Sequence, residues 1–130
     1  MYQMPSYAQF GILISSASLG IAEGMVEHYR DFITDHKALM TGKVSRLEIP
    51  QQLKIAEAKV CVDAAHAIAR DICNKLVAHA EAGTLPNGEE RTKYRAHGTF
   101  IGLQAWRAGN VIWDAAVSYT HLTLPTSDLV

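Results

Sequence analysis

The sequence has almost no excess of charge of either sign. Its 130 residues include 12 Lys and Arg against 13 Asp and Glu, which gives a formal net charge of -1 at pH 7. Proteins whose main function is to bind nucleic acid or an anionic membrane surface carry a basic surface that attracts phosphate groups. The charge balance therefore argues against nucleic acid and against a membrane surface as partners.

Cysteine is equally scarce. Only Cys61 and Cys73 occur, and both fall in one segment with a helical pattern. Twelve residues of helix separate two Cα atoms by about 18 Å, whereas a disulfide needs Cα atoms within about 7 Å of each other. We expect two free thiols that pack as small buried hydrophobic side chains, in a reducing, cytoplasmic compartment.

The sequence also lacks the motifs of common enzyme classes. It has no Gly-x-Ser-x-Gly motif and no glycine-rich phosphate loop. A ferritin-like di-iron bundle uses two Glu-x-x-His pairs and two further glutamates, but here only Asp63 and His66 come near that spacing. Lys59 and Arg70 share their helical face, so we interpret these side chains as a solvated ion-pair stripe. No metal site is predicted.

What the sequence does contain is hydrophobic residues at helical spacing. The 48% hydrophobic and 19% charged content is that of one globular domain. The first helical pattern covers residues 5–33, with an apolar stripe at Phe10, Leu13, Ala17, Ile21, Met25 and His28 or Tyr29. Its apolar run at residues 7–26 is interrupted by Gln9, Glu23 and three serines, which argues against a membrane span. Residues 35–48 are expected to be a surface connection.

The second pattern covers residues 50–82, between Pro50 and Gly83. Proline suits the first turn of a helix, and glycine commonly follows the last. Two adjacent apolar stripes run along it: Leu53, Ala56, Val60, Ala64, Ile68, Ile72 and Leu76, and Ile55, Ala58, Val62, Ala65, Ala69 and Cys73. A helix with two apolar stripes packs against two neighbours, which predicts an all-α antiparallel bundle.

The third pattern begins after Asn87, a predicted N-cap followed by the acidic Glu89 and Glu90, and extends to about Ala115. Small residues recur along it and along the first pattern, which predicts close approach of the two helices. They are Gly98, Gly102, Ala105 and Gly109 on the third, and Ser16, Gly20 and Gly24 on the first. Tyr94, Trp106 and Trp113 are interpreted as core or interface anchors rather than cofactor contacts.

The C-terminal stretch, residues 116–130, differs from the helical patterns before it. Eleven residues, AVSYTHLTLPT, resemble the conceptual translation of a transposase sequencing adapter. We therefore predict a domain at residues 1–115 and an artefactual tail at residues 116–130, which we exclude from the expected fold. If the tail is read-through, the domain is a fragment.

Several segments resemble one family of flavoproteins. They are Tyr2 to Pro5, Ser18 to Met25, Pro50 to Ala58 and Val62 to Ala65. Together they look like the C-terminal helical domain of the acyl-CoA dehydrogenase-like superfamily, a four-helix bundle of which three helices are present here. Within it they are most similar to the oxygenase component of two-component flavin-dependent monooxygenases. The likeness covers nearly all of residues 1–115.

The resemblance implies a parent enzyme that hydroxylates phenolic or steroid-derived aromatic substrates with O2 and reduced flavin, FMN or FAD. The same likeness implies a separate flavin reductase as a partner and a homotetramer built through the helical bundle. It also implies that Gln3 and Gln52 contact the cofactor. The bundle would wall a dry pocket, and the fragment alone would be inactive. Oxygenases of this type carry arginine where this chain has Gln3, and an aromatic residue where it has Ser6. Pro5 is kept.

Two alternatives remain open at this point. The first is the C-terminal domain of an acyl-CoA dehydrogenase, in which some members place a catalytic glutamate about two turns before the glycine that matches Gly20. Phe10 and Gly11 occupy that neighbourhood here, with no carboxylate. The second is a non-enzymatic helical oligomerisation module whose apolar stripes pack on copies of itself.

Overall fold

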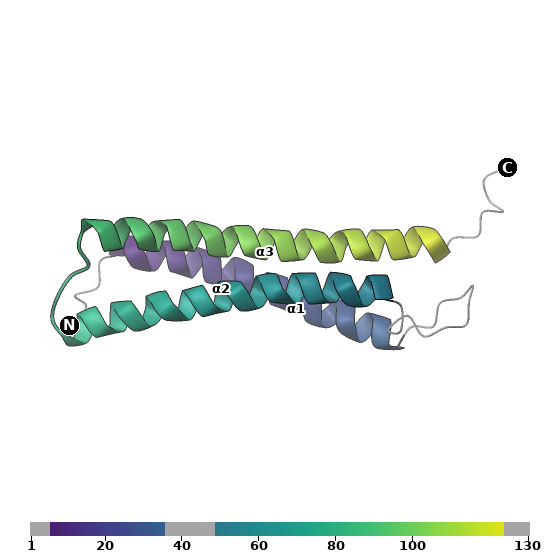
Figure 1. Cartoon of the computed structure of the whole chain (residues 1–130), viewed down its shortest axis with the longest axis horizontal. Coiled ribbons are helices and arrows are strands. Elements are labelled where there is room, and N and C mark those ends of the chain that lie inside the picture. The colour runs from purple at the N-terminus through teal and green to yellow at the C-terminus, as the bar shows by residue number, and fades with distance from the viewer. Residues whose placement is uncertain (1–5, 36–48, 124–130) are drawn as a thin grey trace.

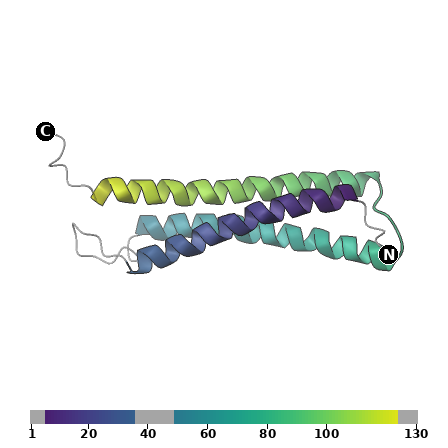
Figure 2. The same ribbon diagram turned by 180° about the vertical axis from the view of Figure 1, so that it is seen from behind.

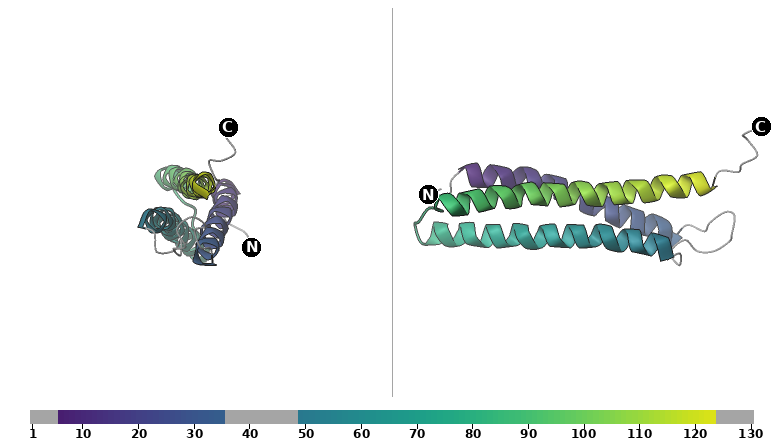
Figure 3. Two further views of the ribbon diagram at one scale, coloured as in Figure 1. Left: turned by 90° about the vertical axis from the view of Figure 1, so that its right-hand side faces the viewer. Right: turned by 45° about the horizontal axis from the view of Figure 1, so that its top comes forward.

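The computed structural model describes the chain at residues 6–35 and 49–123. These residues form three helices, α1 (Ser6–Asp35), α2 (Ile49–Glu81) and α3 (Gly88–Thr123), and contain no strand. The helices run up, down and up along one long axis (Figure 1), and an end-on view shows them arranged as a triangle (Figure 3). The predicted all-α antiparallel bundle is confirmed for this part of the chain.

Helix α1 buries a different stripe from the one predicted. Its buried side chains are spaced four and three residues apart: Ser15, Leu19, Ala22, Val26, Tyr29 and Ile33. On the predicted stripe, Phe10 is 67% exposed, Leu13 65% and Ile21 68%. Two apolar stripes share this helix, and periodicity alone does not say which one faces the other two helices. The prediction was therefore wrong about the face for most of these residues, although Tyr29 is buried, and an apolar stripe of α1 is left uncovered.

Helix α2 packs along α3 and also contacts α1, as its two predicted stripes required. The buried part of the helix includes Ala58, Val62, Ala65, Ile72 and Leu76. The first half of the predicted stripe that begins at Leu53 faces outward, because Leu53 and Val60 are both largely exposed. The two stripes therefore merge into one buried face rather than covering two full sides of the helix.

Helix α3 continues to Thr123, past the expected end at Ala115. The residues that follow Ala115 keep a helical backbone up to Thr123, so the predicted end of the helix was wrong. Of these, Val117 and Ser118 are exposed. The adapter-like origin of residues 116–130 remains a prediction, and residues 124–130 lie outside the described part of the chain.

The small residues of α3 approach α1 at two points: a Cβ added to Gly109 would lie 3.6 Å from Met25 Sδ, and the backbones come close at Gly98. A Cβ added to Gly98 would lie 3.8 Å from the backbone of Gly11 and 3.9 Å from Ser15 Oγ. The Ser15 hydroxyl lies 2.8 Å from the carbonyl oxygens of both Gly11 and Gly98. Ser16, Gly20 and Gly24 are exposed, so those predicted contacts are not made within the described bundle.

A view from the opposite side shows α1 crossing the other two helices obliquely (Figure 2). Its N-terminal part lies beside α3, in agreement with the Ser15 contact, and its C-terminal end lies beside the start of α2. The core between the helices is apolar, and its largest fully buried side chains are Val62, Ile72 and Ile101. All three helices contribute buried side chains to this core, and α3 contacts both α1 and α2 extensively.

Residues Gln9–Thr34 of α1 form one helix long and apolar enough to cross a membrane by length and composition. The core helix of a soluble bundle meets the same criteria. Here α1 buries one stripe against α2 and α3 and leaves the other uncovered, so the criteria alone are weak evidence of a span.

Candidate functional site

Of the two residues predicted to contact a cofactor, only Gln52 lies in the described part of the chain. Gln3 lies outside the described residues. Gln52 is exposed in the first turn of α2. Its neighbour Gln51 is buried and accepts a hydrogen bond of 2.6 Å from the Tyr29 hydroxyl through Oε1. This buried polar pair was missed by sequence reasoning, although Tyr29 stood at the edge of the predicted α1 stripe.

The Asp-x-x-His pair does not converge on a common point. Asp63 pairs with Lys59 at 2.9 Å, as the ion-pair interpretation predicted. His66 instead reaches across to α1, where its Nε2 lies 3.2 Å from Glu23 Oε2. Among the described residues no group of three potential metal ligands comes together. The pair therefore serves local and interhelical contacts.

The aromatic and thiol side chains divide between core and surface. Tyr94 is buried in the core, where burial raises the pKa of its hydroxyl. Trp106 is 67% exposed and Trp113 is 64% exposed, so the core interpretation is wrong for both. Both cysteines are free, as predicted, but only Cys61 is buried, and Cys73 lies at the surface.

The exposed tryptophans border an apolar groove between α1 and α3. The groove has a volume of about 420 Å³. Its lining comprises Ser18, Ile21, Ala22, Met25, Gly102, Ala105, Trp106, Gly109, Asn110 and Trp113. A second hollow of about 260 Å³ shares Met25 and Trp113 with it and extends toward Phe32 and Ala116. No Asp, Glu, Lys or Arg lines either space.

The outer side of α1 has the same apolar character. Phe10, Leu13 and Ile14 are all more than half exposed. The first carboxylate along α1 is Glu23, more than four turns from the start of the helix. Over that length the described part of α1 carries no Asp, Glu, His, Lys or Arg.

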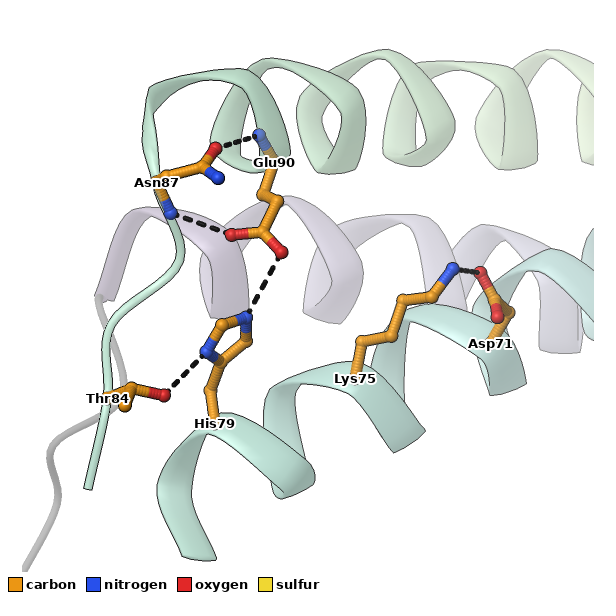
Figure 4. Close-up of polar contacts among 6 residues, drawn as sticks. All are labelled: Asp71, Lys75, His79, Thr84, Asn87 and Glu90. Carbon is orange, nitrogen blue, oxygen red and sulfur yellow. Dashed lines mark hydrogen bonds and ion pairs between the residues drawn. The ribbon is translucent and has the colours of Figure 1, made fainter. Parts of the chain in front are cut away.

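The turn between α2 and α3 is fixed by a group of polar contacts (Figure 4). Gly83 has a φ of 64°, and hydrogen bonds from the amides at positions 83 and 84 close a Schellman motif at the end of α2. Asn87 and Glu90 form a reciprocal capping box, with Glu90 N donating to Asn87 Oδ1 at 2.9 Å and Asn87 N donating to Glu90 Oε2 at 2.8 Å. The predicted N-cap is confirmed.

His79 ties this cap to α2. Its Nε2 lies 3.4 Å from Glu90 Oε1, and its Nδ1 lies 2.9 Å from Thr84 Oγ1. The hydrogen bond from the Asn87 amide, together with His79, lowers the pKa of Glu90 below its ordinary value of 4.5. The turn is a rigid structural connection rather than a place for chemistry.

Acidification is expected to weaken this cap. Because the pKa of Glu90 is lowered in the folded state, the stability that its carboxylate contributes is present above pH 4.5 and is lost as the pH falls through the lowered value. Glu90→Gln keeps a capping side chain but removes the titration, so its unfolding free energy should fall less on acidification than that of the wild type. Urea denaturation at a series of pH values between about 3 and 6 measures this.

Glu89→Gln is the matched control, because it removes a carboxylate from the same helical turn without touching the capping box. It should retain the wild-type dependence on pH. Equal pH dependence in the Glu90→Gln variant and the wild type would contradict the role assigned to Glu90.

Comparison with known proteins bears on the whole bundle rather than on one site. The family model for the acyl-CoA dehydrogenase, C-terminal domain, matches residues 12–120, which include nearly all of the three helices. No curated protein and no solved structure matches the chain. The match covers well over half of the 130 residues, and the helical fold agrees with it. This chain belongs to the acyl-CoA dehydrogenase C-terminal domain family.

Proposed function

We propose that this chain is the helical wall of a flavin-dependent oxygenase that hydroxylates a small aromatic substrate. The observation that carries the proposal is the outer side of α1, where Phe10, Leu13 and Ile14 are exposed and no carboxylate precedes Glu23. An apolar wall excludes water from a reaction that water would divert. A surface without a carboxylate suits oxygen chemistry better than the removal of a substrate proton by this helix.

The described residues are better suited to lining an apolar pocket than to forming a complete flavin site. Gln52, which is exposed in the first turn of α2, would contact the cofactor, and Gln3 would add a second contact from outside the described part. Reduced flavin, FMN or FAD, supplies the activation of O2 when bound. This chain would contribute apolar surface and orientation, and other parts of a longer protein would hold the phosphate.

The partners follow from the same proposal. A separate flavin reductase would deliver the reduced cofactor, and the enzyme would be a homotetramer assembled through this bundle. The uncovered apolar side chains of α1 and α3 support association, because apolar patches of this kind mark interaction sites on soluble proteins.

Acyl-CoA dehydrogenation is the second candidate, and membership of the family favours it. Such an enzyme needs a carboxylate that removes a proton from the substrate. The described part of α1 offers none before Glu23, so that base would have to be a carboxylate outside this stretch. The two candidates thus differ in the fate of O2 and in the need for an acidic residue.

A full-length protein containing this bundle should consume O2 and form hydroxylated product when given reduced flavin and a phenolic substrate. Reduction of an artificial electron acceptor in the presence of acyl-CoA, without O2 consumption, would identify a dehydrogenase instead.

Leu13→Ser should raise several-fold the fraction of O2 released as H2O2, because the serine lets water reach the apolar surface that α1 is proposed to provide. Leu53→Ser is the matched control, since Leu53 is 64% exposed on α2 and Leu13 65% on α1. Equal H2O2 release from the Leu13→Ser and Leu53→Ser variants would show that α1 does not exclude water from the reaction.

A further inference from the structure

A hollow opens between the first half of α1 and the last part of α2. It has a volume of about 270 Å³ and is lined by Gln9, Ile12, Leu13, Cys73, Leu76 and Val77. We call it the α1–α2 hollow. The contact of Ser15 with Gly98 holds this part of α1 beside α3, and α1 crosses the bundle obliquely (Figure 2). Helices α1 and α2 therefore diverge here, and the space between them stays partly open.

The α1–α2 hollow is mainly apolar and has no charged lining residue. Leu76 is 4% exposed and belongs to the core beneath it, whereas Leu13 is 65% exposed and Val77 46%. None of the six lining residues is Asp, Glu, His, Lys or Arg. A charged ligand would lose water here without gaining an ionic partner. Because sites for drug-sized ligands have about 300–1,000 Å³, this volume fits a smaller, uncharged molecule.

Two neutral polar groups face each other across this apolar lining. Gln9 comes from α1 and Cys73 from α2. Gln9 is half-buried, and within the described part of the chain its amide makes no hydrogen bond. A side-chain amide has an acceptor oxygen and two N–H donors, so it can bind a hydroxyl group as donor or as acceptor, whereas a thiol does so only weakly. The hollow therefore combines a small apolar space with one effective hydrogen-bonding group.

We propose that the α1–α2 hollow binds a one-ring phenol, with the ring against Leu13 and Leu76 and the hydroxyl at the Gln9 amide. A rigid ring fits this space better than a flexible chain, because the ring loses no internal freedom on binding. The ring also buries a large apolar area against the aliphatic side chains. Leu13 belongs both to this hollow and to the apolar wall proposed for α1, so the hollow gives the substrate ring a position on that wall.

The inference rests on the proposed function, since it locates the substrate of that oxygenase. Its test measures binding to the 130-residue chain, without flavin or O2. If the full-length protein hydroxylates phenols but the hollow does not bind them, only the location is overturned. If the hollow binds phenols but the full-length protein does not hydroxylate them, only the oxygenase is overturned.

Cys73 provides a reporter for the hollow. It is exposed, whereas Cys61 is 6% exposed in the core. Alkylation by iodoacetamide should therefore be faster at Cys73, and mass spectrometry of the two peptides separates the rates. We expect p-cresol to slow alkylation of Cys73 at least fivefold and to leave Cys61 unchanged. Saturation should lie in the millimolar range, because so small a ligand makes few contacts.

Two further ligands test the chemistry of the site. Toluene has the same ring and methyl group as p-cresol but no hydroxyl, so it should need a severalfold higher concentration to protect Cys73. The charged 4-methylbenzoate should protect at least tenfold more weakly than p-cresol, because no cationic side chain lines the hollow.

Two variants with matched controls test the residues. Gln9→Leu should weaken protection by p-cresol at least fivefold without weakening protection by toluene, because it removes only the hydrogen-bonding group. Gln104→Leu is its control, since Gln104 is also half-buried but lies on α3 outside the hollow. Val77→Glu should weaken both ligands, whereas Val60→Glu, at a position 66% exposed on the same helix, should weaken neither. Each variant is compared with itself without ligand, and circular dichroism checks that the helices are retained.

Three results would overturn the proposal. Alkylation of Cys73 that p-cresol does not slow would show that the hollow is not a site for phenols. Equal slowing at Cys61 and Cys73 would show a general effect on the fold instead of occupancy of the hollow. Protection that is equal for p-cresol and toluene, or that survives Gln9→Leu, would remove the amide from recognition of the hydroxyl.

Discussion

Replacing Ile72 with alanine is expected to lower the free energy of unfolding by about 2–5 kcal/mol. The Ile72 side chain is fully buried and is one of the three largest such side chains, together with Val62 and Ile101. Truncation removes buried methyl and methylene groups and leaves a cavity that straight helices cannot close. Domains of this size have a total stability of about 5–15 kcal/mol, so the loss is a large fraction of the whole.

Urea denaturation followed by circular dichroism at 222 nm measures the change, with the slope on denaturant compared between variants. Val60→Ala is the control on the same helix, because Val60 is 66% exposed. It should change the unfolding free energy by no more than about 0.5 kcal/mol, and alanine's higher helix propensity favours a small gain. Comparable losses in the two variants would show that α2 does not bury the face described here.

The helices themselves could be predicted because their ends carry local signals. Pro50 and Gly83 bracket α2, and Asn87 with Glu90 starts α3, as the capping box shows. These signals act within one helical turn, so they are independent of what the helix packs against. The end of α3 was missed because no stop signal precedes Pro125 in the sequence, and the change in composition at Ala116 was taken for a boundary.

The choice of buried face could not be predicted in the same way. Helix α1 has one stripe containing Leu19 and Val26 and another containing Phe10 and Ile21, and both repeat at helical spacing. The first stripe is buried where Ser15 meets Gly98 and lets the helices approach. That outcome depends on a contact 83 residues away in sequence, which periodicity does not contain. The exposed stripe and the exposed tryptophans are therefore the new information that the structure supplies.

The candidate site was predictable only in part, for a related reason. Gln52 was chosen by resemblance, whereas the buried glutamine beside it, Gln51, is revealed only by its pairing with Tyr29 across two helices. Asp63 and His66 are neighbours on α2, yet each takes its partner from a different direction. Sequence spacing identifies side chains on one helical face, but the partner helix decides which of them interact.

The second large effect is expected at the hydrogen bond between Tyr29 and Gln51. Tyr29 is 4% exposed and Gln51 is 8% exposed, and the hydroxyl donates to Gln51 Oε1 at 2.6 Å. Tyr29→Phe preserves the ring and removes this donor from a buried acceptor, which should cost about 1–3 kcal/mol of unfolding free energy. Gln51→Leu should be similarly destabilising, because it leaves the buried hydroxyl without that acceptor.

The double variant Tyr29→Phe with Gln51→Leu separates the hydrogen bond from packing. Replacing both partners by apolar groups of similar shape removes the unsatisfied polar atom, so the double variant should be more stable than either single variant. Helices α1 and α2 contact each other less than either contacts α3, and this bond, together with the His66–Glu23 pair, joins that sparsest interface. Loss of the bond should therefore speed hydrogen exchange at α1 amides near Tyr29 more than at amides near Ser15, where α1 is held by α3. Uniform faster exchange along α1, or additive losses in the double variant, would show that the two side chains act separately.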